Sequence, residues 1–364
     1  MSSFAERARR GIERCTDDDL AELREFRAGI YGDRVDEVAT ASPEWLFDAN
    51  PFRSPEGRGL WICRRDGRIV GQQAEVAFGL RASGETLRVS AAIELMVDPA
   101  WRLRGVGPAL SQVQLDASRV VVGLSLSADG YRLYQRAGWI DLGVIDRYVM
   151  VLRNVAEHGN PATGARDRAV AVATATAAVG AVSLAHARTA STHLEAIDAF
   201  DARADGLWAA VAPSYPVLAC RDVESLRWRL DLSPNADSYR RFYVLRRDRV
   251  VGYFVVRSSR WRGAPMLQVV DYFADPRWVG VVLAHCVTLA KREGNALVQV
   301  LTRNRPAHRR IQSLGFVRSE RRNPVRFMIW IDADDPLHDV LTVPDNWLIT
   351  DADADRQFAA TASG

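Results

Sequence analysis

The segment IELMVDPAWRLRGVGPAL, from Ile93 to Leu110, decides how the rest of the chain is interpreted. Its apolar start predicts a strand, which ends at Asp98-Pro99 because proline has no N–H for a strand ladder. The sequence RLRGVG (102–107) follows and runs into a predicted helix over 106–117. Glycines remove side-chain bulk at the helix start, where backbone N–H groups and the helix dipole attract anions. With its two arginines, the loop predicts a phosphate or pyrophosphate site. The loop fits neither the dinucleotide-binding fingerprint G-x-G-x-x-G nor the nucleotide-binding P-loop G-x-x-x-x-G-K-[ST].

Outward from this segment, the first 153 residues predict an alternation of strands and helices. Residues 17–31 predict a helix capped by Thr16 or Asp17, and Asp66-Gly67 predicts the turn of a hairpin over 60–76. The remaining predicted elements are a short strand at 11–16, strands at 91–99 and 120–126, a short helix that ends at Arg136 before Gly138, and a strand at 148–152 that closes the sheet.

The second part of the chain repeats this order. A strand at 193–200 is followed by two helical stretches over 202–230 and a hairpin over 243–256. A strand at 267–276, which also ends in Asp-Pro, then precedes a helix at 279–294, a strand, a helix and a last strand at 326–331. The shared order predicts duplication. The expected domains are 1–153 and 191–350, with an Ala-rich connector over 154–190 and a flexible tail over 351–364.

Composition limits the classes of function. The 364 residues are enough for about two domains, and the net charge of only +3 gives no basic field that would attract nucleic acid. Four scattered cysteines and six scattered histidines predict neither a metal site nor disulfides, which favours a cytoplasmic protein. No leader is expected, since the first residues carry charge throughout. The uncharged stretch Ala169–Ala187 is long enough to span a membrane but weakly apolar, so a connector is favoured.

The succession of an acidic apolar strand, Asp-Pro, R-x-x-G-x-G, a helix, a strand and LYQRAGW (133–139) resembles the GCN5-related N-acetyltransferase (GNAT) family. The resemblance covers about residues 10–153 in motif, and about 190–331 in element order alone. It implies an α/β (α+β) fold of two tandem GNAT-like domains. Each would have a mixed, mostly antiparallel sheet flanked by helices.

The resemblance also implies a site for acetyl-CoA or another acyl-CoA. Tyr134 would protonate the departing thiolate, and Glu94 would take the proton of the attacking ammonium. Alternatively, Tyr134 is a core tyrosine and Glu94 pairs structurally with an arginine. Ser127 stands where the family often has asparagine, which puts the contacts with pantetheine on that side of the site in doubt. The implied cofactor-binding residues are Met96, Val97, Arg102, Leu103, Arg104, Gly105, Val106, Gly107 and Ser127.

The second copy departs from the family pattern. Val282 and Ala284 fall where the two loop glycines belong, and Ile311 stands in the place of the tyrosine. Side chains there would obstruct a pyrophosphate, although Asp271 occupies the place of Glu94. We expect this copy to be degenerate for CoA binding, with a structural role or a role as one wall of the acceptor pocket.

These observations predict a cytoplasmic acyl-CoA-dependent N-acyltransferase, most simply one that transfers acetyl to a small-molecule amine by direct attack. Trp45, Phe47 and Phe52 lie where this family often shapes its acceptor site. No metal, nucleic acid or membrane is expected as a partner, and the protein would be a monomer or homodimer. Two alternatives are an inactive CoA-sensing scaffold and an aminoacyl-tRNA-dependent tandem GNAT transferase. The retained Tyr134 and Glu94 argue against the scaffold, and the pyrophosphate loop argues against the tRNA-dependent transferase.

Overall fold

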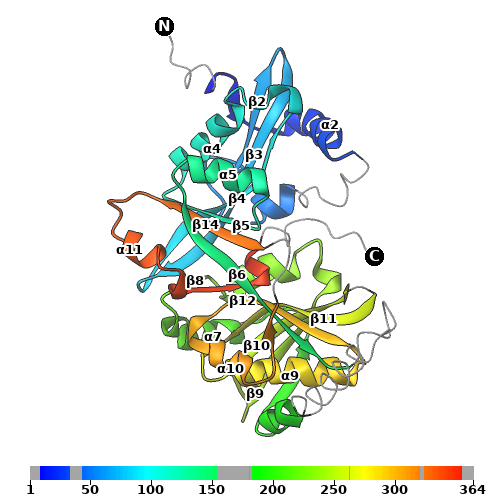
Figure 1. Cartoon of the computed structure of the whole chain (residues 1–364). Coiled ribbons are helices and arrows are strands. Elements are labelled where there is room, and N and C mark those ends of the chain that lie inside the picture. Colours follow the sequence, from blue (N-terminus) through cyan, green and yellow to red (C-terminus); the bar gives the residue numbers. More distant parts are fainter. Residues whose placement is uncertain are drawn as a thin grey trace.

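The computed structural model describes residues 9–32, 43–153, 180, 183–261, 263–319 and 324–354. Most of the described strands connect into one path of hydrogen-bonded neighbours that runs through both halves of the chain, and the strands Ile12–Arg14 and Leu60–Arg65 branch off it. In Figure 1 the first half, in blue and cyan, lies above the second half, in green to orange. This mixed sheet with flanking helices confirms the predicted fold class.

The first half contains the predicted elements in the predicted order. Thr16 and Asp19 form a capping box before the first long helix, and Asp66 and Gly67 both take positive φ angles in a tight hairpin turn. Its strands are β1 (Ile12–Arg14), β2 (Leu60–Arg65), β3 (Arg68–Ala82), β4 (Glu85–Val97), β5 (Val120–Leu124) and β6 (Ile140–Val151). Its helices are α2 (Leu20–Tyr31), α4 (Val106–Ala117) and α5 (Ala128–Arg136), with short helical turns η1 (Asp17–Asp19), η3 (Glu44–Asp48) and η4 (Pro99–Trp101).

The second half repeats this order and adds three short strands that were not predicted, β8, β13 and β15. Its strands are β7 (His193–Ile197), β8 (Val217–Ala219), β9 (Arg240–Arg246), β10 (Arg249–Trp261), β11 (Ala264–Ala274), β12 (Leu297–Arg303), β13 (Val317–Arg318), β14 (Val325–Ile331) and β15 (Trp347–Thr350). Its helices are α7 (Arg203–Val211), α8 (Val223–Leu226), α9 (Val279–Arg292), α10 (His308–Gln312) and α11 (His338–Leu341). Short helical turns are η6 (Ala212–Ser214), η7 (Arg227–Asp231), η8 (Ala236–Ser238), η9 (Arg305–Ala307), η10 (Pro344–Asn346) and η11 (Asp351–Asp353).

The two halves exchange their closing strands, so the expectation that residues 148–152 close the first sheet is wrong. Strand β14 of the second half lies between β5 and β6 in the first sheet, as the orange strand in Figure 1 shows. Residues 140–145 of β6 pair with β14, but residues 146–151 pair with β12 of the second half. The centre of β14, Phe327–Ile329, is buried on both faces, which suits an interior strand.

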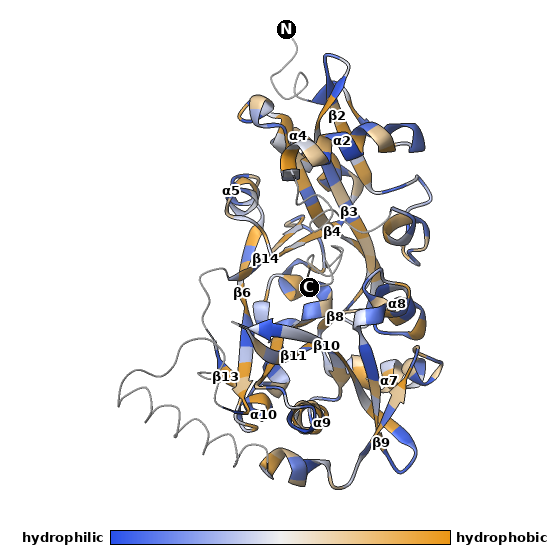
Figure 2. Cartoon of the chain, turned by 90° about the vertical axis from the view of Figure 1, so that its right-hand side faces the viewer, coloured by the Kyte–Doolittle hydropathy of each residue, from blue (hydrophilic) through white to orange (hydrophobic). Residues whose placement is uncertain are grey.

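Helices cover both faces of the first sheet. Neighbouring residues of β4 point to opposite faces of the sheet. Ile93 lies in one cluster with Leu23 of α2, whereas Ala92 lies in another with Tyr134 of α5. Helices α4 and α5 therefore lie on the opposite face from α2, as Figure 2 shows. The second half meets the α2 face, where the Trp45 and Trp228 rings stack 5.8 Å apart. Each indole Nε1 donates to the other residue's carbonyl oxygen at 2.8 Å.

Residues 351–354, the described start of the tail that was expected to be flexible from Asp351 onward, are part of the fold. Asp351 is fully buried and accepts a hydrogen bond from the Gln268 side chain, while Asp353 pairs with two arginines. Residues 355–364 lie outside the described part of the chain. So do residues 169–179 and 181–182 of the stretch considered as a membrane span. None of the described helices is long and apolar enough to cross a membrane.

Candidate active site

Strands β4 and β5 part from each other at the centre of the first sheet. They are parallel, and their paired residues are Ser90 with Val121 and Ala91 with Val122. Beyond these pairs, β4 continues to Val97 and keeps β3 as its neighbour on the other side. The peptide groups of β4 that face the β4–β5 opening can therefore bind a ligand in the place of a neighbouring strand. Met96 and Val97, the predicted backbone contacts, lie at the open end.

The predicted anion-binding loop lies directly after β4. Leu103 and Gly105 take positive φ angles, and Gly105 is the N-cap of α4. Ala109 donates its N–H to the Gly105 carbonyl at 3.1 Å, so the N–H groups of Val106 and Gly107 belong to the unpaired first turn of the helix. The Arg104 guanidinium lies over the Trp101 ring, 5.1 Å from its centroid, and Arg102 is exposed. The loop thus combines free N–H groups at the start of a helix with two neighbouring arginines, which suits an anion.

Glu94 reaches the α2 face through a β-bulge. Opposite β4, the register moves from Gln72–Met96 to Ala74–Ile93, which leaves one extra residue in β4, and Glu94 has a φ of 50°. Its carboxylate is 2.9 Å from the Arg27 guanidinium and accepts a hydrogen bond from Gln72 at 3.1 Å. The side chain is only 8% exposed. Glu94, the predicted base, therefore forms the ion pair with an arginine that was expected if its role were structural.

Tyr134 lies on the other face of the sheet, in α5. The residue is buried, and its ring stacks on Trp139 with centroids 4.1 Å apart and an angle of 15° between planes. It shares this cluster with Ala92 of β4 and Val121 of β5, the two strands that border the opening. The two predicted catalytic side chains thus flank the β4–β5 opening from opposite faces. Such an arrangement suits a base that acts on the incoming amine and an acid that acts on the leaving group.

Ser127 has a structural task in this arrangement. It is the N-cap of α5, and its hydroxyl accepts a hydrogen bond from the Gly130 N–H at 3.1 Å. This cap sets the start of the helix that carries Tyr134. Its predicted contact with a cofactor stays a prediction.

The corresponding opening in the second half is filled by the chain itself. There residues Met266–Val269 of β11 pair with Leu297–Val300 of β12, and beyond these residues the two strands part. The C-terminal segment, defined here as Trp347–Asp353, enters this gap: Ile349 and Thr350 pair with β12. On the other side, the Thr350 hydroxyl donates to Asp271 of β11 at 2.6 Å. The chain itself thus occupies the position that corresponds to the β4–β5 opening beside Glu94.

The second loop also lacks an open anion site. Asp275 follows β11 directly, and hydrogen bonds from Arg277 hold the pKa of its carboxyl below the usual range, so the group stays negative. The expectation that Val282 and Ala284 take the places of the two loop glycines is wrong, because both lie inside α9. At the start of α9, Trp278 is the N-cap where α4 has Gly105. Ile311 is buried where the first half has Tyr134. These features support the expectation that the second copy is degenerate for CoA.

A buried charged network was missed from the sequence. Arg221 bonds to Asp271 at 3.1 Å and to Asp353 at 2.9 Å, and Asp353 also bonds to Arg229 at 2.9 Å. Burial by itself would raise the pKa of Asp353, but the two guanidinium groups hold it below the usual range. The acidic, alanine-rich composition after Asp351 hid this role, since it is typical of a solvated tail.

Comparisons with known proteins agree with this geometry. No family model matches the chain, and no curated protein matches its sequence. Its structure resembles a probable N-acyltransferase from Enterococcus faecalis (TM-score 0.59, 10% identity) over 88% of this chain and 72% of that one. A GCN5-related N-acetyltransferase from Kribbella flavida matches at TM-score 0.57 and 15% identity, over 88% and 71% of the two chains. Saccharomyces cerevisiae N-myristoyltransferase with bound myristoyl-CoA matches at TM-score 0.54 and 11% identity, over 88% and 83%.

The chain therefore has the GNAT fold. More particularly, it has the tandem GNAT arrangement that N-myristoyltransferase also has, over most of its length. At sequence identities of 10–15% the structural likeness shows the fold alone, and the activity has to follow from the residues of the site.

Proposed function

We propose that this protein is an acyl-CoA-dependent N-acyltransferase whose first half binds the acyl-CoA and performs the reaction. The observation that carries the proposal is the β4–β5 opening. A glycine–arginine loop lies at one end of it, and Glu94 and Tyr134 border it from opposite faces. The loop would hold the pyrophosphate, and the β4 backbone would pair with the pantetheine arm.

The proposed chemistry is a direct transfer. An alkylamine has a pKa near 10.4, so it must lose a proton before its nitrogen can attack. Glu94 takes that proton, directly or through a water molecule, and the neutral nitrogen attacks the thioester carbonyl carbon. The C–N bond forms, the C–S bond breaks, and the Tyr134 hydroxyl gives its proton to the CoA thiolate. The bonded nitrogen then loses its second proton to solvent, and Tyr134 takes a proton back from solvent. A base and an acid in these positions each typically contribute about 10²–10⁴-fold to the rate.

We assign acetyl as the simplest acyl group and a small-molecule amine as the acceptor, in the cytoplasm. The second half contributes to the acceptor side of the site, because Trp228 and the C-terminal segment stand on the Glu94 face of the sheet. It would form one wall of an acceptor site beside the first-half residues Trp45 and Phe47.

The test is release of free CoA thiol from acetyl-CoA in the presence of a panel of primary amines. Tyr134→Phe is expected to lower turnover about 10²-fold while acetyl-CoA affinity stays near the wild-type value. Tyr131→Phe is the matched control on the same helix, since the Tyr131 hydroxyl bonds to Asp141. Equal turnover of Tyr134→Phe and wild type would remove Tyr134 as the acid. Binding without turnover of any amine would favour the inactive CoA-binding scaffold.

A further inference from the structure

We propose that the closed end of the β4–β5 opening is an acyl-chain pocket that selects uncharged acyl groups about one or two carbon atoms longer than acetyl. Propionyl and butyryl are the simplest such groups. This inference rests on the proposed function. It refines the acyl group assigned there, because acetyl would leave this cavity empty and a slightly longer group would fill it.

The cavity lies where an acyl chain must end. Its wall includes Ala91 and Val122, the last pair of residues before β4 and β5 part, and Leu124 just beyond them. The anion-binding loop follows the other end of β4, at the open end of the gap. A pantetheine arm held by that loop therefore enters from the open end, and its thioester lies deepest. Anything attached to the thioester carbonyl points toward this cavity.

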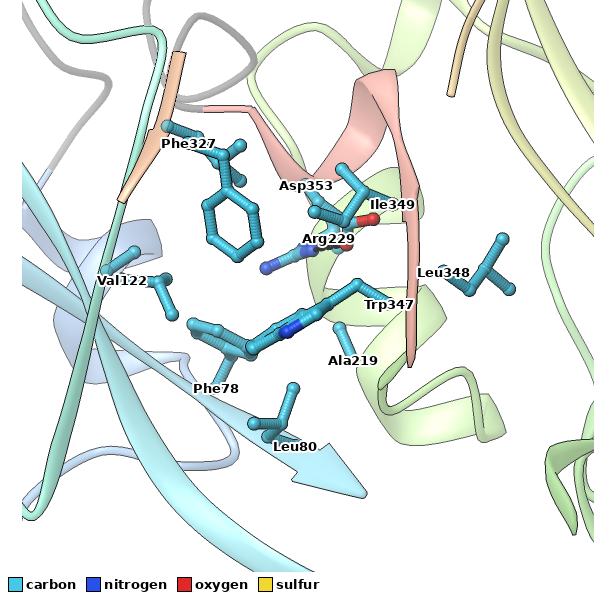
Figure 3. Close-up of a pocket in the computed structure, with 12 residues that line it drawn as sticks. Phe78, Leu80, Val122, Ala219, Arg229, Phe327, Trp347, Leu348, Ile349 and Asp353 are labelled. Carbon is cyan, nitrogen blue, oxygen red and sulfur yellow. Dashed lines mark hydrogen bonds and ion pairs between the residues drawn. The ribbon is translucent and has the colours of Figure 1, made fainter. Parts of the chain in front are cut away.

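The wall of the cavity suits an uncharged, aliphatic group. Around it stand apolar side chains from both halves, among them Phe78, Phe327 and Trp347 (Figure 3). The two charged members of the wall, Arg229 and Asp353, bond to each other at 2.9 Å. Together with Arg221 and Asp271 they form a network of two cations and two anions, whose charges cancel. The cavity thus offers apolar contact and no net charge to a ligand.

The size of the cavity sets the length of the chain. Its volume is about 20 Å³, and a cavity needs roughly 10–15 Å³ to hold one water molecule. One or two methylene groups fit this space. Further growth is blocked by Trp347, whose ring meets Phe327 edge to face with centroids 4.9 Å apart. A long fatty acyl chain would have to displace these buried rings.

The second half supplies the far wall and so determines the specificity. Ala219 of β8 and Trp347 of β15 face the cavity from the side opposite β4 and β5. These are the two short strands that connect the halves, since β8 pairs with β3 of the first half and with β15. The second half, whose own opening is filled by the C-terminal segment, thereby forms one wall of the acyl-chain pocket of the first half.

The test is calorimetric titration of the full chain with free CoA and with acetyl-, propionyl-, butyryl-, octanoyl- and myristoyl-CoA. Each buried methylene is expected to tighten binding about fourfold, so affinity rises from acetyl to butyryl and then falls for octanoyl and myristoyl. Equal affinity from acetyl to butyryl would overturn the pocket but leave the proposed function intact. Tightest binding of myristoyl-CoA would overturn the assigned length. No binding of any acyl-CoA would contradict the proposed function itself.

Two variants with opposite effects make the test independent of stability. Ala219→Leu fills the cavity and should lower the affinity ratio of butyryl- to acetyl-CoA at least tenfold. Trp347→Leu enlarges it and should move the optimum to longer chains, a gain that damage to the fold does not produce. Gly206→Ala is the control, because a Cβ there meets no atom within 4 Å. An unchanged ratio in Ala219→Leu, or the same shift in Gly206→Ala, would contradict the assignment.

Discussion

Glu94 owes its position to one extra residue in β4. A regular strand would turn its side chain toward α4 and α5, on the face of Ala92. The bulge instead places Glu94 on the same face as Ile93, where Arg27 and Gln72 contact it. A non-glycine residue with positive φ is strained, by about 1–3 kcal/mol, and such strain often marks a functional site. We therefore interpret the bulge as a device that directs a carboxylate to the acceptor side.

Glu94→Gln separates a catalytic carboxylate from a structural one. The amide keeps the size of the side chain and can still bond to its neighbours, but it cannot accept a proton from the amine. We expect kcat to fall about 10²-fold with little change in acetyl-CoA affinity. The measurement is steady-state kinetics alongside urea unfolding. Lower stability with full activity would reduce Glu94 to the partner of Arg27.

His285 in α9 makes stability depend on pH. Burial lowers its pKa from 6.5 to about 4, and His193 adds to this shift; the ring nitrogen Nε2 lies 2.8 Å from the Thr192 hydroxyl. Because the unfolded chain binds the proton more readily, the neutral ring stabilises the fold fully above pH 6.5. This contribution, about 3 kcal/mol, is lost as pH falls from 6.5 toward 4.

The measurement is the free energy of unfolding in urea at pH 7.5 and pH 4.5. We expect His285→Gln to lose less stability than wild type over this interval, and the control His338→Gln, on the more exposed α11, to behave as wild type. An identical loss in His285→Gln and wild type would show that other groups govern the acid sensitivity.

At the scale of elements, the C-terminal segment stabilises the fold by filling the second opening. Its Asp353 neutralises two buried arginines, Arg221 and Arg229. Removing one partner of a buried ion pair leaves a charge without compensation, which typically costs 3–5 kcal/mol.

Asp353→Asn is therefore expected to lower the free energy of unfolding by about 3 kcal/mol, measured in urea. Asp345→Asn is the control, since Asp345 pairs with Arg305 at 3.4 Å on an exposed surface, where such a pair contributes below about 1 kcal/mol. Equal effects of the two variants would mean that the C-terminal segment adds little stability.

Much of this element order could be predicted from the sequence, because it depends on local signals. The Asp66-Gly67 turn, the Thr16 cap and the apolar runs each specify their element without the rest of the chain. Strands β8, β13 and β15 were missed, because two to four residues are too few for a periodic pattern. The hairpin between β3 and β4 was missed as well, although Ser83-Gly84 carries a turn signal.

The strand exchange belongs to the whole molecule and could not be predicted. Periodicity marks β6 and β14 as strands, but it does not specify which sheet an apolar closing strand joins. The candidate site shows the same limit. Motif spacing predicted a role for the loop, Tyr134 and Glu94. The pair of Glu94 with Arg27 and the cavity between the halves could not be predicted, because they depend on contacts between residues distant in sequence.

The exchange should make the two halves unfold together. Met328 of β14 lies in the cluster around Tyr134 and Trp139, so a residue of the second half completes the core of the first. We expect one urea transition, with coincident curves from tryptophan fluorescence and far-UV circular dichroism. Met328→Ala should lower the stability of both halves by about 2–5 kcal/mol, measured by hydrogen exchange in β5 and β11. Separate transitions, or a loss confined to β5, would contradict this coupling.

The central claim is that the β4–β5 opening of the first half is the acyl-CoA site. Its most direct test is calorimetric titration with acetyl-CoA of wild type, Gly107→Asp and the matched Gly280→Asp variant, in which the same substitution lies at the start of α9. An aspartate at position 107 brings negative charge to the anion-binding loop. The account predicts one site per chain, lost in Gly107→Asp and kept in Gly280→Asp. Two sites per chain, binding unaffected by Gly107→Asp, or no binding to wild type at millimolar acetyl-CoA would contradict it.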